Sequence, residues 1–409
     1  MRILFLSPRQ PLPARSGAKL REYHFLRALG RSAEITYLYF IDPGAQGLTP
    51  ADLRFCREVV GIPKPPAYGL IKTFRGIAGR WPLPILNYTS AEMSAEVRRL
   101  VNTREFDIVH LDSIHMIRCA IAATELKSSL KAVYNWHNIE SEAMRRYSAT
   151  APSGARRWYA GYTASRLERL EKDILHSAFG HIVCSDRERG QLLRVVPAAR
   201  VAVVENGVDT DYFASCGEVP TASRRVVFVG AMDYFPNREA AVFFAERIWP
   251  HVRKRLSGAE LAIVGANPGA AVLALGELPG VKVTGTVPDV RPFYREALAA
   301  VVPLRTGGGT RLKILEAMAA GVPVVSTPLG AEGLAGVTDG ENALMVDSAD
   351  TEGWAGALES IANSPDRRAQ LAAAGLRLVQ SRYDWEILGA RLRAIYEDWL
   401  RENASATER

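Results

Sequence analysis

The chain has 409 residues, of which 48% are hydrophobic and 23% are charged, and it carries a formal net charge of +7. This composition is that of a globular protein, and the length exceeds what one compact core normally holds, so two domains are expected. The positive charge favours acidic partners such as nucleotides, phosphorylated lipids or an anionic membrane surface.

The sequence shows neither a membrane span nor an export signal. No run reaches the length of about 18 apolar residues that a membrane-spanning helix needs. The N-terminal run MRILFLSP is too short for a signal peptide and is expected to be a first strand. The cysteines lack metal-like spacing and are expected to be buried, reduced thiols: Cys56, Cys119, Cys184 and Cys216. We therefore expect a cytoplasmic protein, with peripheral contact to the inner face of the membrane left open.

Apolar runs alternate with helical patterns in the first half of the chain. The expected strands are residues 2–7, 35–40, 107–111, 132–136 and 182–185, and the expected helices include 18–29, 113–126 and 155–177. Such alternation predicts a parallel sheet covered by helices.

Residues 64–96 do not fit this alternation, because they combine basic residues with apolar and aromatic ones. The basic residues are Lys72, Arg75 and Arg80, and the others are Leu70, Ile71, Phe74, Ile77, Trp81, Leu83, Ile85 and Leu86. Two interpretations are open: a helical excursion packed on the N-terminal domain, or an interfacial or acceptor-binding surface.

A stretch rich in turn formers, residues 203–225, precedes a second alternating pattern and marks the connection between domains. The expected strands beyond it are residues 225–230, 260–265, 282–285, 300–304 and 322–327, and the expected helices are 237–256, 290–298 and 311–320. The fold class is therefore α/β with two Rossmann-like halves. Ligands in such sheets bind beyond the carboxyl ends of the strands, so we expect the active site in the cleft between the halves.

Residues 299–330 form the most informative stretch, because a strand, a glycine-rich loop and a helix follow in succession. Gly307, Gly308 and Gly309 allow a tight turn, and Thr310 is expected to cap the helix. Arg311 and Lys313 would then place two cations at the positive end of the helix dipole, which predicts a bound anion such as phosphate. Neither the P-loop nor the GxGxxG pattern is present. Residues two apart on a helix point about 200° apart, so both cations can reach one phosphate group only if the first turn is irregular.

The last helical pattern, residues 385–402, has apolar residues at 385, 388, 392, 395, 396 and 399. That spacing predicts a helix with one apolar face. Such a helix can cap its own domain or cross back to the first one, and the pattern alone leaves both open.

The order of motifs resembles that of GT-B glycosyltransferases of family 4. The matching residues are Ser16-Gly17, His137-Asn138, Asn206-Gly207-Val208-Asp209, Gly230, Gly285-Thr286-Val287 and the block from Pro303 to Gly321 followed by Val322-Pro323-Val324-Val325. The resemblance runs through essentially the whole chain. It implies two Rossmann-like domains facing each other across a deep cleft: an acceptor-binding domain at 1–205, a nucleotide-sugar-binding domain at 206–384, and a final helix at 385–409 that crosses back to the first domain.

The resemblance also implies an activity, the transfer of a sugar with retention of configuration from a nucleotide-diphosphate sugar. The expected acceptor is a glycan, a lipid-linked compound or another hydroxyl compound, in cell-envelope polysaccharide synthesis. No pair of carboxylates that a retaining glycosidase needs about 5 Å apart stands out. We expect cations of the protein to take the place of a metal on the diphosphate, and we expect no cofactor and no nucleic-acid partner. Two alternatives stay open: a nucleotide-sugar epimerase of the same fold, and a non-catalytic nucleotide-sugar-binding protein.

Site residues follow from the same resemblance. Glu316 matches the second glutamate of a family motif and would bind the donor ribose, whereas Gly308 replaces the first glutamate. The expected catalytic residues are His137, which would contact the donor sugar, and Arg311 and Lys313, which would neutralise the diphosphate. The expected donor-binding residues are Gly17, Gly230, Gly285, Val287, Arg305, Gly307, Gly308, Gly309, Thr310 and Glu316, while the acceptor-binding residues stay unidentified. For His110, which has Asp112 close by, two interpretations are equally open: a core residue or a site residue.

Overall fold

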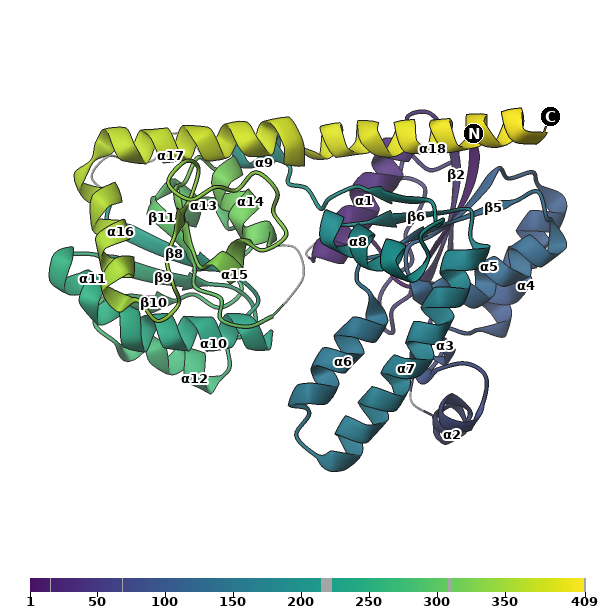
Figure 1. The fold of residues 1–409 in the computed structure, drawn as a ribbon, viewed down its shortest axis with the longest axis horizontal. Coiled ribbons are helices and arrows are strands. Elements are labelled where there is room, and N and C mark those ends of the chain that lie inside the picture. The colour runs from purple at the N-terminus through teal and green to yellow at the C-terminus, as the bar shows by residue number, and fades with distance from the viewer. Residues whose placement is uncertain (15, 68, 215–222, 308–310, 408–409) are drawn as a thin grey trace. The chain divides into compact units, whose positions relative to one another are not determined.

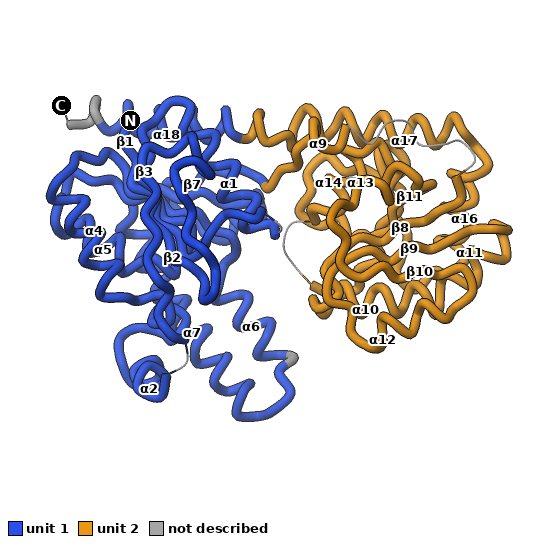
Figure 2. Tube along the Cα trace, turned by 180° about the vertical axis from the view of Figure 1, so that it is seen from behind, with its two compact units in different colours: residues 1–205, 389–409 blue, residues 206–388 orange. Residues whose placement is uncertain are grey.

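The protein is described by a computed structural model that covers residues 1–14, 16–67, 69–214, 223–307 and 311–407. Its chain divides into two compact units (Figure 2). Unit 1 comprises Met1–Glu205 together with Gly389–Arg409, and unit 2 comprises Asn206–Leu388. Among the described residues, no helix combines the length and the apolar character needed to cross a bilayer.

Unit 1 is built on a seven-stranded sheet in the order β3-β2-β1-β4-β5-β6-β7. The strands are β1 (Arg2–Ser7), β2 (Glu34–Ile41), β3 (Glu58–Pro63), β4 (Ile108–Leu111), β5 (Lys131–Asn135), β6 (Gly180–Val183) and β7 (Val201–Val203), and all neighbours are parallel. β1 is buried from Ile3 to Ser7. Such continuous burial is typical of a parallel strand that helices cover on both faces.

The helices of unit 1 are α1 (Gly17–Leu29), α2 (Leu70–Ala78), α3 (Leu83–Leu86), α4 (Ala91–Thr103), the 3-10 turn η1 (Ile114–Met116), α5 (Ile117–Leu126), α6 (Glu140–Thr150), α7 (Gly154–Ser177) and α8 (Asp186–Val195). Serines begin several of them: the side chains of Ser16, Ser90, Ser153 and Ser185 each accept a hydrogen bond from a backbone N–H in the first turn. α6 and α7 form a helical hairpin that protrudes from the sheet layers, with α2 beside α7 (Figure 1).

Unit 2 has a six-stranded parallel sheet in the order β10-β9-β8-β11-β12-β13. Its strands are β8 (Arg225–Val229), β9 (Glu260–Val264), β10 (Val281–Val283), β11 (Ala297–Val302), β12 (Val324–Ser326) and β13 (Leu344–Met345). Its helical segments are α9 (Thr210–Ala214), α10 (Phe235–Phe243), η2 (Phe244–Ile248), α11 (Trp249–Arg255), α12 (Ala270–Leu273), η3 (Ala274–Glu277), α13 (Arg291–Arg295), α14 (Leu312–Ala319), α15 (Pro328–Ala331), α16 (Thr351–Asn363), α17 (Pro365–Leu378) and η4 (Val379–Tyr383). The prediction of two parallel α/β sheets is thus confirmed. The strands β3, β7 and β13 were not expected.

The start of the helix after the glycine-rich loop differs from the prediction. α14 begins at Leu312, and Arg311 takes the cap position with non-helical φ and ψ angles of −89° and 62°. The predicted cap Thr310, together with Gly308 and Gly309, lies outside the described residues. Arg311 therefore lies at the cap position, where its side chain is not restricted to a helical direction.

The last helix, α18 (Trp385–Thr407), belongs to unit 2 up to Leu388 and to unit 1 from Gly389 onward. Within unit 1, a Cβ atom on Gly389 would lie 2.6 Å from the Cβ of Ala28. Further along, the Tyr396 hydroxyl lies 2.5 Å from His110 Nδ1 on β4. This part of α18 is therefore packed closely on unit 1.

Candidate functional site

At the carboxyl end of the unit 2 sheet, Lys313 of α14 lies close to the end of β8. Lys313 Nζ donates a hydrogen bond of 2.5 Å to Asn237 Oδ1, and Asn237 Nδ2 donates one of 2.9 Å to the carbonyl of Ala231. A Cβ atom on Gly230, directly after β8, would lie 2.8 Å from Asn237 Nδ2 and 3.2 Å from Lys313 Nζ. Because real Cβ atoms do not come that close, glycine at this position lets the lysine and the amide lie over the strand end.

Burial lowers the pKa of Lys313 to about 7, and the neighbouring charge of Arg311 lowers it too, whereas Glu316 acts in the opposite direction. The ammonium group also lies 5.0 Å from the centre of the Phe228 ring. The free site therefore holds a lysine that is easily deprotonated at neutral pH. An arriving anion would favour the protonated form.

Arg311 is 4% exposed, and its guanidinium donates to the carbonyls of Gly307 (3.2 Å) and Leu329 (3.3 Å). Gly307 has a φ of +102°, and a Cβ atom there would lie 2.8 Å from Cγ of Pro236. The loop before α14 is thus packed against the start of α10. Arg311 and Lys313 have different hydrogen-bond partners.

Glu316 lies three residues after Lys313, on the same side of α14. Burial raises the pKa of Glu316, while Lys313 and a hydrogen bond with Tyr294 act to lower it. The Glu316 carboxyl group, Lys313 and Arg311 therefore form one cluster of interacting charges that is partly shielded from water.

Glycines occupy the ends of three neighbouring strands of unit 2. The Gly230 N–H donates to the carbonyl of Val264 (2.9 Å), and the Gly265 N–H donates to the carbonyl of Gly285 (3.2 Å). Gly265 and Gly285 have φ angles of +156° and +72°. A Cβ atom on Gly265 would lie 1.7 Å from the carbonyl oxygen of Gly230, so glycine there allows the ends of β8 and β9 to approach closely, whereas a Cβ atom on Gly285 would meet nothing within 4 Å.

The structure places the other predicted donor-binding residues differently. Arg305 forms an ion pair of 2.9 Å with Glu239 of α10 and stacks on Phe243, so its guanidinium is committed to α10 rather than to the Lys313 group. Val287 is partly buried against the unit 2 core. Gly17 is the first residue of α1 in unit 1, directly after the cap residue Ser16.

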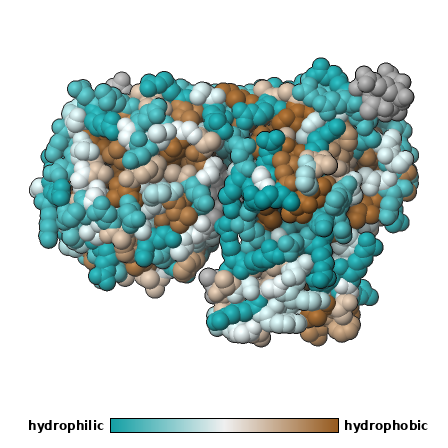
Figure 3. Space-filling model, viewed as in Figure 1, coloured by the Kyte–Doolittle hydropathy of each residue, from teal (hydrophilic) through white to brown (hydrophobic). Residues whose placement is uncertain are grey.

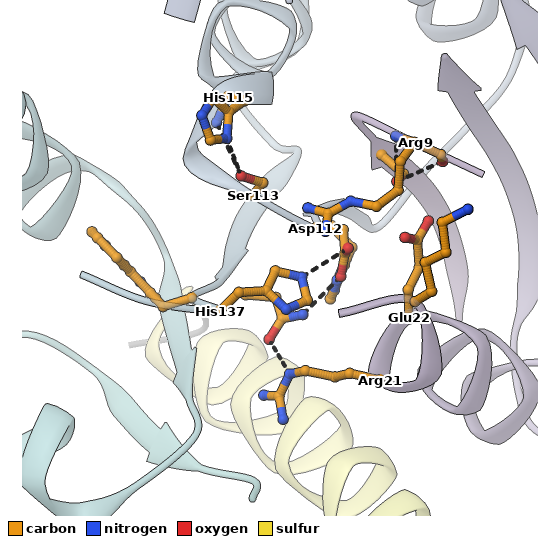
Figure 4. A network of polar contacts seen from close by, with 12 residues as sticks. Arg9, Arg21, Glu22, Asp112, Ser113, His115 and His137 are labelled. Atoms are coloured by element: carbon orange, nitrogen blue, oxygen red, sulfur yellow. Dashed lines mark hydrogen bonds and ion pairs between the residues drawn. The ribbon is translucent and has the colours of Figure 1, made fainter. Parts of the chain in front are cut away.

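A second polar cluster lies in unit 1, at the carboxyl ends of β4 and β5 (Figure 4). His137 Nε2 lies 2.9 Å from Asp112 Oδ2, and Asn135 Nδ2 donates to Asp112 Oδ1 at 2.7 Å. Arg21 Nε in turn donates to Asn135 Oδ1 at 2.9 Å, and its terminal nitrogen donates to the carbonyl of Val204 at 2.7 Å. Asp112 and Arg21 are fully buried. These hydrogen bonds fix the position of Asp112, which in turn contacts the ring of His137.

The two buried carboxyl groups of this cluster have opposite pKa shifts. Burial acts to raise the pKa of Asp112, but interactions with His137 and His110 outweigh it and hold that pKa below its ordinary value. Burial and the charge of Asp112 raise the pKa of Glu22 well above its ordinary value. The Tyr37 hydroxyl lies 2.5 Å from Glu22 Oε1 and 2.9 Å from the carbonyl of Arg9. Since a hydroxyl has one hydrogen, a protonated Glu22 accounts for both contacts.

Arg9 follows β1, and its side chain extends toward Asp112 (Figure 4). Its charge acts to lower the pKa of Asp112, of Glu22 and of Glu140. Sequence reasoning did not select Arg9, Glu22 or Asp112 as site residues. The missed signal for Asp112 is its place directly after the buried strand β4, whereas His137 lies two residues after β5. His110 is fully buried and bonded to Tyr396, which places it in the core.

Two family models match the chain. Residues 48–212 match "Glycosyltransferase Family 4", and residues 223–364 match "Glycosyl transferases group 1". The chain belongs to the family 4 glycosyltransferases. The predicted resemblance is thereby confirmed.

Curated relatives of this family 4 glycosyltransferase match over part of their length. It is 29% identical over 253 residues to D-inositol 3-phosphate glycosyltransferase of Thermobispora bispora, covering 56% of this chain and 57% of that protein. It is 30% identical over 242 residues to phosphatidyl-myo-inositol mannosyltransferase of Mycolicibacterium smegmatis, covering 58% and 61%. The matched regions thus span less than two thirds of either relative.

Solved structures share the fold over nearly the whole chain. Sucrose-phosphate synthase from Thermosynechococcus elongatus superposes with a TM-score of 0.68 at 18% identity, covering 98% of this chain and 100% of that one. HepE from Anabaena, in complex with UDP and glucose, superposes with a TM-score of 0.65 at 15% identity, covering 97% and 100%. At these identities the likeness establishes the GT-B fold, as predicted.

Proposed function

We propose that this family 4 glycosyltransferase transfers a sugar from a nucleotide-diphosphate sugar to a hydroxyl acceptor, with retention of anomeric configuration. The observation that carries the proposal is the position of Lys313: half-buried at the end of β8, bonded to Asn237, beside Arg311, with a pKa lowered to about 7. A diphosphate bound there would relieve the repulsion between the two cations.

The chemistry that we propose for the site around Lys313 follows from charge. The departing nucleotide diphosphate gains negative charge as its bond to the sugar breaks, so cations held in place stabilise the transition state more than the ground state. Lys313 and Arg311 supply these charges, and we propose that they do so without a metal ion or a cofactor. Glu316, three residues further along α14, accepts hydrogen bonds from the ribose hydroxyls.

We propose that His137 binds the transferred sugar and that Asp112 orients its ring. A histidine whose Nε2 is bonded to an ionised aspartate presents its other nitrogen to a ligand. The acceptor proton then passes to the departing phosphate oxygen on the same face of the sugar, so no nucleophilic side chain is needed.

The names of the relatives suggest which donors and acceptors to examine. One similar protein, 31% identical over 236 residues, is a GDP-mannose-dependent phosphatidylinositol monomannoside mannosyltransferase of Mycobacterium tuberculosis, and HepE was solved with UDP and glucose. We propose an acceptor with an anionic or lipid-linked character, in keeping with the net charge of +7, used at the cytoplasmic face of the cell envelope.

Radiolabelled GDP-mannose and UDP-glucose test the proposal, each offered to the purified protein with membrane extract, with inositol phosphate, with phosphatidylinositol, and with no acceptor. Transfer of label to an extractable lipid, glycan or inositol compound supports it. Epimerisation of the sugar in the absence of acceptor, or binding without nucleotide release under every condition, would overturn it. The matched variants are Glu316→Gln, expected to lose transfer, and Glu332→Gln, an exposed glutamate of the same unit, expected to keep it.

A further inference from the structure

Helix α2 presents large apolar side chains to solvent. Within the described residues of unit 1, Leu70 is 91% exposed, Ile71 69% and Phe74 71%, with Ile77 behind them at 37%. A protein in water usually buries such side chains, and a contiguous exposed set is typical of an interaction surface.

The apolar side of α2 faces away from the protein because the helix packs through its opposite side. At about 100° per residue, the four apolar side chains fall within an arc of about 120°. Gly76 lies roughly opposite this arc and is the buried residue of α2, and a Cβ atom there would lie 2.8 Å from the Cβ of Leu83. This is the reverse of an ordinary surface helix, which turns its apolar side inward.

Side chains of α7 hold α2 in this orientation. Arg166 donates hydrogen bonds to the carbonyls of Gly76 and Gly79, and the Tyr162 hydroxyl donates to the carbonyl of Ile77 at 2.7 Å. The C-terminal carbonyls of α2 are thus satisfied by a neighbouring helix. These contacts fix the orientation of α2, so its apolar side chains are held facing solvent.

An aromatic pair extends the surface onto α7. Trp158 is 63% exposed and stacks on Tyr162, with ring centres 5.5 Å apart. Tryptophan and tyrosine are the residues that favour the boundary between lipid and water. The space-filling view shows hydrophobic atoms gathered over α2 at its lower edge (Figure 3).

The basic residues in the segment that contains α2 indicate what kind of surface its apolar side would bind. No aspartate or glutamate occurs between Glu58 and Glu92, while four cations do: Lys64, Lys72, Arg75 and Arg80. In the structure Lys64 is paired with Asp42 at 3.1 Å, which leaves Lys72, Arg75 and Arg80 as the cations of this segment. An apolar helix side in a segment that carries cations and no acidic residue is complementary to a surface of anionic lipid headgroups over hydrocarbon. We propose that α2, with Trp158, docks this protein on an anionic lipid bilayer, lying in the interface with Leu70, Ile71 and Phe74 inserted.

Vesicle co-sedimentation of the full chain tests this proposal and needs no nucleotide sugar, so its outcome is independent of the proposed activity. We expect binding to vesicles of phosphatidylcholine with phosphatidylglycerol, little binding to phosphatidylcholine alone, and weaker binding at high salt. The double variant Ile71→Ser/Phe74→Ser is expected to weaken binding at least about tenfold, because each apolar side chain contributes that order of affinity. Lys72→Glu/Arg75→Glu is expected to abolish the preference for anionic vesicles.

The control is Leu273→Ser, which removes a 54% exposed leucine of α12 in unit 2 and is expected to leave vesicle binding unchanged. Variants of Ile71, Phe74 and Leu273 should keep the wild-type melting temperature, since these side chains are exposed. Failure of the wild type to bind anionic vesicles, or undiminished binding by Ile71→Ser/Phe74→Ser, would overturn the proposal. So would a dimer in gel filtration that this double variant converts to a monomer, because a second copy would then cover the face.

Discussion

His137 Nε2 lies 2.9 Å from Asp112 Oδ2, although the two residues are 25 positions apart and leave different strands. β4 and β5 are neighbours in the sheet, with His110 in register with Val133, so residues just beyond their carboxyl ends meet. Asp112 is itself held by Asn135. The pair therefore has the geometry of a histidine whose orientation is set by a buried, ionised carboxylate.

Asp112→Asn tests whether that orientation serves catalysis. We expect kcat of the proposed transfer to fall about 10- to 100-fold with KM for the donor little changed, a loss typical of removing the partner that orients a functional histidine. Steady-state kinetics with the donor found in the radiolabel assay measure it. His137→Ala and the double variant complete a cycle: if Asp112 acts through His137, the double variant loses no more than His137→Ala alone. Independent, multiplicative losses would contradict this role.

The lowered pKa of Lys313 predicts a pH-dependent affinity for nucleotide diphosphates. The anion binds best to the protonated lysine, so binding raises the lysine pKa above its free value of about 7. Affinity should therefore fall as pH rises above about 7, by up to about tenfold per pH unit, with proton uptake on binding. Isothermal titration of GDP and UDP at pH 8, in buffers that differ in ionisation enthalpy, measures the uptake.

Arginine stays charged throughout this pH range, so Lys313→Arg should flatten the profile and remove the proton uptake. Lys282→Arg makes the same exchange at an exposed position on β10 and should preserve both. A wild-type affinity that is constant from pH 6.5 to pH 9 would show that Lys313 does not touch the diphosphate.

Gly230→Ala probes the close approach of Lys313 to the end of β8. The new methyl group would meet Asn237 Nδ2 at 2.8 Å and Lys313 Nζ at 3.2 Å, so the amide and the lysine must move. We expect affinity for the nucleotide diphosphate to fall about tenfold, or ~1.4 kcal/mol. Gly276→Ala is the matched control, since a Cβ atom there meets nothing within 4 Å. Equal affinities of the two variants would count against a diphosphate site at Gly230.

The sequence sufficed for much of the fold because the buried strands are marked by local patterns. β1 has the predicted bounds, and α7 was expected at 155–177 and spans Gly154–Ser177. β3 was missed because its residues are only half-buried, and β13 because it has two residues. Short or partly exposed strands are specified by pairing with a neighbour rather than by a local pattern.

For the candidate site, the sequence indicated residues of one segment but not their partners. Lys313 and Glu316 were selected from the helix that carries them, while Asn237, 76 positions before Lys313, became visible only in the folded sheet. Glu22 lies within a predicted helix, and nothing local marks it as a buried carboxyl group beside Tyr37 and Asp112. The functional roles of all these residues stay predictions.

Tyr396→Phe tests how firmly α18 is bound to unit 1. The tyrosine hydroxyl lies 2.5 Å from His110 Nδ1, and both side chains are fully buried, so phenylalanine leaves that ring nitrogen without its partner. A buried polar atom that loses its hydrogen bond costs about 1–3 kcal/mol of the free energy of unfolding. Urea unfolding followed by tryptophan fluorescence measures the difference. Tyr159→Phe removes a buried hydroxyl that makes no hydrogen bond within the described residues, so it should not lower the free energy of unfolding. If Tyr396→Phe proved as stable as Tyr159→Phe, the Tyr396–His110 hydrogen bond would contribute nothing to the attachment of α18.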